Sequence, residues 1–388
     1  METGRPRLGR LLVITFLESF MTILIERGVY FFAKHRLGFT DATNLWLALA
    51  FGGAYVVGSL LSHPLSRRIG EKALLSGAIA AQVAVAAALA LRADTVSLFL
   101  LQALMAFIFG LKWPVIESYV CARQTPRQVA RSLGMFNFCW SAAVPLSLAA
   151  AGPLIDWRAD ALFIAAGAFS VASFLLALPL PRRLEHMPHD HPERPSAADI
   201  PRYRALLVAS RSQMLASYAS LWILAALMPG IFERLSQPLS AATGLAAVLA
   251  IARIAAFLAL GHYKGWHNRA APLAAAMIAL PAGFFMVLFG PNLTVVLIGE
   301  VIFGLAAGMV YYAALYYAMV VMNASVEAGG GHEALIGGGF ALGPACALLG
   351  MGLLPLLQSR LLGTLAGVGP LFVACSGVAI WGMLRARK

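Results

Sequence analysis

Long apolar stretches alternate with short polar ones from one end of the chain to the other. Each of twelve apolar stretches is about as long as the ~20 residues that a membrane-spanning helix needs. We therefore predict transmembrane helices at approximately 10–33, 42–62, 72–91, 96–121, 129–154, 160–180, 204–230, 238–262, 269–289, 292–321, 331–356 and 362–384. The first stretch is too long for a signal-peptide core and contains charges, so we expect it to remain as the first helix.

The composition supports a membrane protein without a sizeable soluble domain. Of the 388 residues, 60% are hydrophobic and 12% are charged, whereas soluble domains average about 25% charged residues. The four cysteines lie in or at the edge of apolar runs without paired spacing, so we expect neither a disulfide framework nor a zinc site. The predicted fold class is an all-α integral membrane protein with twelve transmembrane helices.

The distribution of charge predicts the orientation in the membrane. The formal net charge is +12, but Lys and Arg concentrate in alternate loops, which is typical of topology signals. We therefore expect a multi-pass protein of a bacterial inner (plasma) membrane with both termini in the cytoplasm. We expect the protein to contact the lipid bilayer and not to bind nucleic acid.

The longest polar interruption, at 181–203, is rich in Pro, His and charged residues and predicts a linker. It divides the chain into an N-terminal six-helix bundle at 1–183, a cytoplasmic linker at 184–201 and a C-terminal six-helix bundle at 202–388. Three linker histidines, His186, His189 and His191, form a tract of a kind that sometimes binds metal. Because two prolines interrupt the tract, we favour a solvated linker and expect no metal site and no cofactor.

The loop between the second and third predicted helices, residues 63–75, carries a recognisable motif. It resembles the Gly-x-Leu-Ala-Asp-Arg-x-Gly-Arg-Lys-x-x-Leu signature of the major facilitator superfamily. The positions that match are Leu65, Arg68, Gly70, Lys72 and Leu75, whereas His63, Arg67 and Glu71 depart from the signature. The resemblance implies the major facilitator fold, with two six-helix bundles, and a cytoplasmic gate that includes Arg68, Gly70 and Lys72.

The eleventh predicted helix contains two further features. Gly339, Gly343 and Pro344 resemble the Gly-x-x-x-Gly-Pro element of exporters in the same superfamily, although close helix packing alone explains such a pattern. The helix begins with a glycine run followed by His332 and Glu333, which we place at the cytoplasmic gate as a proton relay or as a cap and hinge.

The first helix contains Glu18 and the segment Glu26-Arg27-Gly-Val-Tyr30. The Glu-Arg-x-x-Tyr part resembles the first-helix signature of proton-coupled oligopeptide transporters, where the Glu and Arg serve proton and carboxylate handling. Carboxylates in a partly dry cavity suit proton transfer, so Glu18, Glu26 and Glu300 are our candidates for proton coupling. The alternative for Glu26 is a salt bridge with Arg27 or Lys112.

Buried charges and aromatic residues suggest a substrate site. A charge at the centre of a membrane helix costs roughly 2.5–3.5 kcal/mol on insertion scales, so it normally faces a wet cavity or a partner. Lys112 and Glu117 are such charges, with a structural ion pair as the alternative, and Arg253 suits an anionic substrate group. The substrate-binding candidates are Arg27, Tyr30, Lys112, Trp113, Glu117, Tyr218, Trp222, Arg253, Tyr311 and Tyr312. Tyr316 and Tyr317 are expected in an interfacial belt.

These features predict a secondary transporter. The chain lacks the Gly-x-x-x-x-Gly-Lys-Ser/Thr motif, so direct ATP drive is not expected, and no nucleophile and base set suggests an enzyme. We expect proton-coupled movement of a small anionic or zwitterionic solute by alternating access. A drug or metabolite exporter, a lipid-moving protein and a non-transporting membrane protein on the same fold remain open alternatives.

Overall fold

The computed structural model describes residues 8–121, 126–184, 198–321 and 326–387. Within these ranges the chain forms helices, turns and bends and no strand. The helices of the first half are α1 (Leu8–Ile23), a π-helical turn (Leu24–Gly28), α2 (Val29–Leu37), α3 (Asp41–Ile69), α4 (Glu71–Leu91), α5 (Thr95–Cys121), α6 (Pro126–Trp157) and α7 (Ala161–Ala177). Those of the second half are α8 (Ile200–Arg234), α9 (Leu239–Leu245), α10 (Val248–His262), a 3-10 turn (Lys264–Trp266), α11 (Ala271–Phe289), α12 (Leu293–Val321), α13 (Val326–Gly352), α14 (Leu354–Leu357) and α15 (Arg360–Arg385).

The predicted all-α membrane fold is confirmed. In the described part of the chain, eleven helical segments are long and apolar enough to cross a membrane, and Ala161–Ala177 is a shorter apolar helix. These segments follow the twelve predicted stretches, with one internal difference. The stretch predicted at 238–262 is interrupted between α9 and α10, where Ala246 and Ala247 lie outside both helices.

The described residues group into two compact units. The first unit comprises residues 8–38, 50–184 and 238–247, and the second comprises 39–49, 198–237 and 248–387, each without the undescribed positions. The chain therefore passes between units within α3, after Leu49, and again at the interruption between α9 and α10. The predicted division at the linker differs from these units at two short segments: residues 39–49 group with the second unit, and residues 238–247 group with the first.

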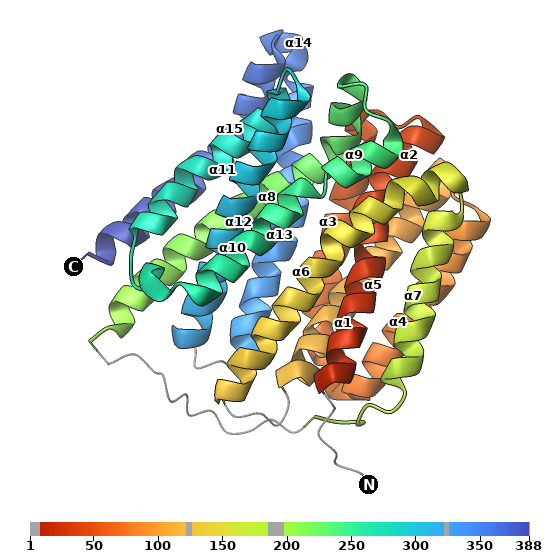
Figure 1. Cartoon of the computed structure of the whole chain (residues 1–388), viewed down its shortest axis with the longest axis horizontal. Helices are drawn as coiled ribbons and strands as arrows, with labels where there is room; N and C mark the ends of the chain where they lie inside the picture. The colour runs from red at the N-terminus through yellow and green to blue at the C-terminus, as the bar shows by residue number, and fades with distance from the viewer. Residues whose placement is uncertain (1–7, 122–125, 185–197, 322–325, 388) are drawn as a thin grey trace. The chain divides into compact units, whose positions relative to one another are not determined.

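In the first unit, α1 packs against α6 and α7, and α4 packs against α5 and α7 (Figure 1). One core cluster joins buried residues of α1, α4 and α5, among them Leu11, Leu75 and Ile116. Because this core is apolar, its buried polar side chains find their partners in one another and in backbone carbonyls, as Gln102 does in that of Ile25.

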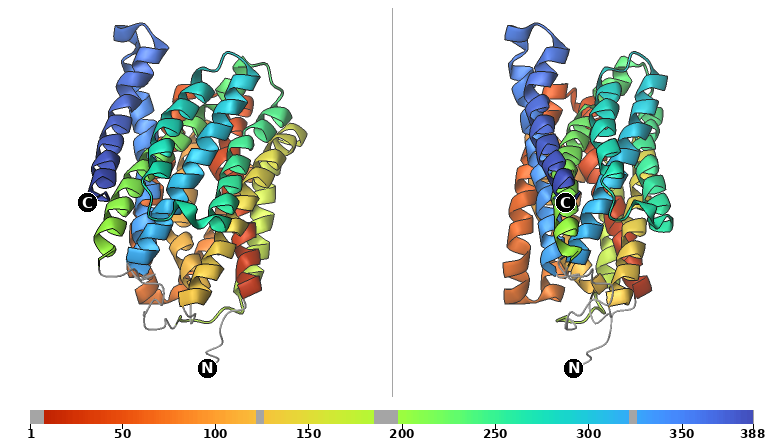
Figure 2. Two further views of the ribbon diagram at one scale, coloured as in Figure 1. Left: turned by 60° about the vertical axis from the view of Figure 1, so that its left-hand side comes forward. Right: turned by 90° about the vertical axis from the view of Figure 1, so that its left-hand side faces the viewer.

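In the second unit, α12 packs against α10 and α11, and α8 packs against α13 and α15. The helices α13 and α15 run beside each other, in blue in both views of Figure 2. Tyr317 is fully buried and lies edge-on to Tyr203 and Trp266, with ring centroids 5.7 and 6.2 Å apart. Tyr316 lies 5.2 Å from Trp266 and stacks on His267 at 4.3 Å. Trp266 and His267 of the loop after α10 thus pack against this pair, and the position of the pair in an interfacial belt stays a prediction.

The turn between α3 and α4 explains one glycine of the predicted gate loop. Gly70 has φ +88° and ψ 151°, a backbone conformation that residues other than glycine rarely adopt. Its N–H donates to the carbonyl of Ser66 at 2.8 Å, and its carbonyl accepts from Leu74 at 3.1 Å. Arg68 is exposed and Lys72 is partly buried. Their function as a gate stays a prediction.

Candidate functional site

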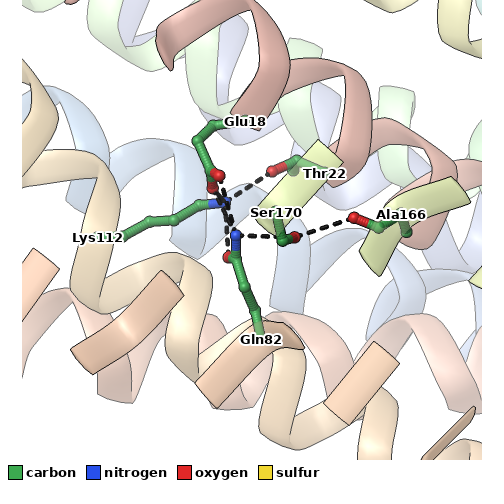
Figure 3. A network of polar contacts seen from close by, with 6 residues as sticks. All are labelled: Glu18, Thr22, Gln82, Lys112, Ala166 and Ser170. Carbon is green, nitrogen blue, oxygen red and sulfur yellow. Dashed lines mark hydrogen bonds and ion pairs between the residues drawn. The ribbon is translucent and has the colours of Figure 1, made fainter. Parts of the chain in front are cut away.

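A dry polar network lies inside the first unit, between α1, α4, α5 and α7 (Figure 3). The Lys112 ammonium lies 2.5 Å from Oε2 of Glu18, and neither side chain is exposed. Lys112 also donates to Oε1 of Gln82 at 3.1 Å and to the Thr22 hydroxyl at 3.2 Å. Gln82 donates to Glu18 at 2.7 and 3.0 Å and lies 3.1 Å from the Ser170 hydroxyl.

The network assigns Glu18 a cation that the sequence does not place near it. Lys112 comes from α5, 94 residues away along the chain, and its charge also lies 4.3 Å from the centroid of the Phe109 ring. In a low-dielectric interior a buried pair is retained only when geometry is good and the remaining polar atoms are satisfied. Gln82, Thr22 and Ser170 meet that need, and of these Gln82 has a visible signal, an amide in the middle of an apolar run.

Glu26 and Arg27 lie in the π-helical turn Leu24–Gly28. Arg27 Nε is 3.6 Å from Glu26 Oε1, and each side chain is 9% exposed, so the salt-bridge alternative for Glu26 has its partner in Arg27. Gln102 of α5 is fully buried and donates to the Ile25 carbonyl at 2.6 Å. Single π-helical turns occur frequently at functional sites. Tyr30, in the following α2, is fully buried.

Two further α5 candidates are Trp113, which lies beside Lys112, and Glu117. Trp113 is partly buried, with its ring centroid 5.2 Å from the Lys112 ammonium and 6.4 Å from the Phe136 ring of α6. Glu117 is partly buried. The first unit thus brings Lys112, Glu18 and the Trp113 ring together.

The second unit contains an aromatic cluster, which we define as Tyr218, Trp222, Phe257, Tyr311 and Phe340. Its residues come from α8, α10, α12 and α13. Trp222 stacks on Phe340 with centroids 3.5 Å apart, and Tyr218 lies 6.2 Å from Tyr311. Phe257 lies 5.3 Å from Tyr311. Three of the predicted candidates, on two helices, thus belong to one cluster.

Close helix packing forms one side of this cluster. A Cβ atom on Gly339 would lie 2.6 Å from the Cβ of Tyr218, and one on Gly343 would overlap the carbonyl oxygen of Ala219. These two glycines let α13 approach the backbone of α8, which places Phe340 against the α8 aromatic residues. The packing interpretation of the Gly-x-x-x-Gly element therefore has a direct structural basis.

A buried guanidinium and a buried carboxyl group lie on two of the helices that form the cluster, α10 and α12. Arg253 of α10 is 3% exposed, and its guanidinium carbon lies 6.0 Å from the centroid of the Phe257 ring. Glu300 of α12 is fully buried and accepts from the backbone N–H of Leu249 at 3.3 Å. Leu249 lies in the first turn of α10, where backbone N–H groups lack helical acceptors and the helix dipole favours an anion.

Tyr312 of α12 and the predicted gate residues His332 and Glu333 of α13 lie in different surroundings. Tyr312 contacts Phe257 at 6.2 Å and Trp266 at 5.7 Å, so it lies between the aromatic cluster and the loop after α10. His332 is 3% exposed, and its ring lies edge-on to Tyr311 with centroids 4.8 Å apart. Glu333 is partly buried. The structure therefore brings His332 to the aromatic cluster, a neighbourhood that its place near the start of α13 did not suggest.

The described residues contain no group of three or more His, Cys, Asp or Glu side chains that could hold a metal ion. The linker histidines His186, His189 and His191 lie outside the described residues.

Comparison with known proteins identifies the family. None of the curated proteins matches the chain by sequence. A solved bacterial homologue of the human lysosomal transporter Spinster, inward-facing and unoccupied, is 15% identical over 99% of this chain and 98% of its own, with a TM-score of 0.71. A structure of proton-dependent oligopeptide transporters is 15% identical over 97% of this chain and 98% of its own, with a TM-score of 0.70. The nucleoside transporter NupG is 11% identical over 98% of both chains, with a TM-score of 0.66.

The similarity to these solved structures shows the fold, and a match to a family sequence model shows which family the chain belongs to. The sequence model described as Major Facilitator Superfamily matches residues 11–344. Because this match extends over most of the chain, the protein belongs to the Major Facilitator Superfamily of membrane transporters.

Proposed function

We propose that the protein is a secondary transporter that moves a small anionic or zwitterionic solute by alternating access. One observation carries this proposal: the buried guanidinium of Arg253 lies beside an aromatic cluster built by four helices of the second unit. A guanidinium binds carboxylate or phosphate groups through two parallel hydrogen bonds, and aromatic rings with hydroxyls offer apolar area with a few polar contacts. Together they suit a solute with an acidic group and an apolar or aromatic part.

The first unit contributes differently to the proposal. The enclosed Glu18–Lys112 pair supports a structural role for both residues, because each charge already has a partner. Glu26 and Arg27 also pair with each other, but at 3.6 Å, in a π-helical turn and with 9% of each side chain exposed, so they are the more suitable first-unit residues for contact with a proton or a solute. Buried ionisable groups in membrane spans generally mark substrate or ion pathways.

Proton coupling is part of the proposal. Glu300 is the candidate in the second unit, because its carboxyl lies at the N-terminus of α10, one end of an interrupted helix. Broken helices with exposed backbone groups at their ends recur at the binding sites of secondary transporters. Two structures with a similar fold are those of proton-dependent oligopeptide transporters and of a nucleoside transporter, so this fold serves solutes with polar and with ring-containing parts.

The proposed setting is a bacterial inner membrane with both termini in the cytoplasm, as the concentration of Lys and Arg in alternate loops indicates. In this orientation the turn with Arg68, Gly70 and Lys72 lies on the cytoplasmic side. Alternating access would be a movement of the two bundles, at 1–183 and 202–388, between inward-open and outward-open forms.

Uptake into proteoliposomes tests this function. The solutes are benzenesulfonate, phenylalanine, benzylammonium and benzenesulfonamide, offered with and without an imposed pH gradient, and protein-free liposomes are the blank. Gradient-dependent uptake of the anion or the zwitterion supports the proposal, and Glu300→Gln should remove its dependence on the gradient. Uptake of benzylammonium alone, or movement of a fluorescent lysophospholipid alone, would instead favour the exporter or the lipid-moving alternative.

A further inference from the structure

One end of the second unit carries a cluster of exposed arginines. They belong to the start of α8, the loop after α10 and the end of α15, and they are Arg202, Arg204, Arg269, Arg385 and Arg387. Within the described segments 198–204, 264–270 and 380–387, the only acidic residue is Asp199. Like charges on one surface repel one another unless solvent or an anion compensates them. This end of the unit is therefore suited to an anionic partner.

The packing of α8 against α15 brings these segments together. The two helices run antiparallel, because Ser212 donates to the Cys375 carbonyl at 3.1 Å, whereas a Cβ on Gly382 would lie 2.7 Å from the earlier Ala205 carbonyl oxygen. One core cluster also contains residues of α8, of the loop after α10 and of α15. The end of α15 therefore lies beside the start of α8 (Figure 2).

Two of the arginines reach the surface at the same level of this helix pair. Arg385 lies almost one turn beyond Gly382, and Arg204 directly precedes Ala205, the residue that Gly382 meets. The guanidinium carbon of Arg385 lies 4.1 Å from the centroid of the Trp381 ring. A guanidinium that rests on an aromatic ring keeps N–H groups at its edge, where they can bind the oxygens of a phosphate.

The arginines border an apolar surface. Trp381 and Leu384 are 47% and 54% exposed, and Val208, one turn after Arg204, is 37% exposed. Both helices are candidate membrane spans, and that of α15 ends at Arg385. Exposed apolar residues of a membrane span face acyl chains, whereas Trp and Arg at its end lie at the level of the headgroups. The partner of this surface must therefore be both anionic and apolar.

We propose that this end of the second unit binds an anionic phospholipid. The phosphodiester accepts hydrogen bonds from Arg204 and Arg385, and an acyl chain lies against the Trp381 ring. Basic sites between membrane helices bind anionic headgroups in this way. A zwitterionic lipid binds less well, because its own cation lies close to the arginines. The inference does not depend on the transported solute, and it concerns a surface outside the proposed substrate site.

Native mass spectrometry of the purified full chain in a neutral maltoside detergent tests the inference. The dissociation constant of the first bound lipid is measured with phosphatidylglycerol and with phosphatidylcholine of identical acyl chains. We expect phosphatidylglycerol to bind more tightly to the wild type. Arg204→Gln and Arg385→Gln should each weaken its binding roughly 5-fold, and the double variant roughly 25-fold, because each arginine near a membrane surface contributes about that factor. Binding of phosphatidylcholine should change little.

Two further variants serve as a control and as a test of the ring. Arg360→Gln removes an exposed arginine at the other end of α15, next to the exposed Leu361 and Leu362, and should change the affinity for phosphatidylglycerol less than 2-fold. Trp381→Leu keeps an apolar side chain but removes the ring under Arg385, and should weaken binding roughly 2- to 5-fold. Because these side chains are exposed, the Tm without lipid should stay close to that of the wild type.

Glycerol 3-phosphate distinguishes a lipid site from a site for a soluble phosphate. The inference predicts that it does not displace phosphatidylglycerol at equal concentration, and displacement would contradict a lipid partner. Equal binding of the two lipids to the wild type, unchanged binding of phosphatidylglycerol in the double variant, or an equal loss in Arg360→Gln would also contradict the inference. None of these results bears on the proposed transport function, which the uptake experiment tests separately.

Discussion

Lys112 and Glu18 form an ion pair, with 2.5 Å between Nζ and Oε2 and no exposed side-chain surface on either residue. Gln82 bonds to both partners, so the pair and the amide form one closed network. Lys112 has two possible roles, as an anchor for the substrate or as a structural partner of Glu18. Substitutions at the two positions separate them.

Removal of one partner should destabilise the protein strongly. Glu18→Gln or Lys112→Met leaves a buried charge without its counter-ion, which costs about 3–5 kcal/mol. The double variant Glu18→Leu with Lys112→Met removes both charges and should be more stable than either single variant, short of wild type by the roughly 1–3 kcal/mol that the buried Gln82 amide costs without these partners. Thermal unfolding in detergent measures all three, with Glu117→Gln as the control at a partly buried acid. If the double variant is as unstable as either single variant, the pair does not explain the two charges.

The contact between α8 and α13 predicts an asymmetry among glycines. Gly343→Ala should cost about 1–3 kcal/mol, because the added methyl would overlap the Ala219 carbonyl and force the helices apart. Gly369→Ala is the matched control on α15, where a Cβ would meet nothing within 4 Å. There the change should be neutral or stabilise by up to about 1 kcal/mol, as usual within a helix. Equal stability of the two variants would contradict this packing.

Trp266 holds the loop after α10 against the end of α12. Its ring contacts Tyr312, Tyr316 and Tyr317, and its indole N–H donates to the Leu260 carbonyl at 3.0 Å. Trp266→Ala should cost about 3–5 kcal/mol in unfolding experiments, as expected for a buried tryptophan. Trp157, which is 73% exposed, provides the control, and Trp157→Ala should change stability by at most about 0.5 kcal/mol. Similar losses in both variants would refute the anchoring role.

Asp94 predicts a pH effect at the start of α5. The backbone N–H of Ser97 donates to its carboxylate at 2.9 Å, and this bond together with the pair to Arg92 lowers the pKa of Asp94 to about 2, from an ordinary 3.8. A lowered pKa means that the stabilising contribution is complete above about pH 4 and is lost as the pH falls toward 2. Asp94→Asn keeps a capping oxygen but cannot titrate, so its Tm should fall less than that of the wild type over this range. Parallel Tm curves would contradict the assignment.

Much of the fold follows from the length and position of apolar runs. Each run predicted as a helix is helical, because a chain in lipid must satisfy its backbone groups internally. The interruption between α9 and α10 was missed, since the run from Leu239 to His262 is almost continuously apolar. The carboxyl group of Glu300, which lies 51 residues further along the chain than Leu249, accepts a hydrogen bond at this interruption.

The candidate residues were identifiable as buried charges and aromatic residues, but their partners were not. Glu18 has no cation near it in sequence, and the partner lies 94 residues away on α5. Tyr311 and Tyr312 are neighbours in sequence, but successive residues of a helix are rotated by about 100°. Tyr311 therefore contacts His332, whereas Tyr312 contacts Trp266. Pairings of this kind depend on which helix faces pack together, and single-helix periodicity does not contain that information.

The central claim, that an anionic group binds at Arg253, is tested most directly by one affinity comparison. The dissociation constants of benzenesulfonate and of neutral benzenesulfonamide are measured for the wild type, Arg253→Lys and Arg253→Gln. We predict that Arg253→Gln weakens binding of the anion roughly 10- to 100-fold and leaves the amide nearly unchanged, with Arg253→Lys in between because lysine lacks the two-pronged geometry. Equal losses for the anion and the amide, or no loss in Arg253→Gln, would contradict the account.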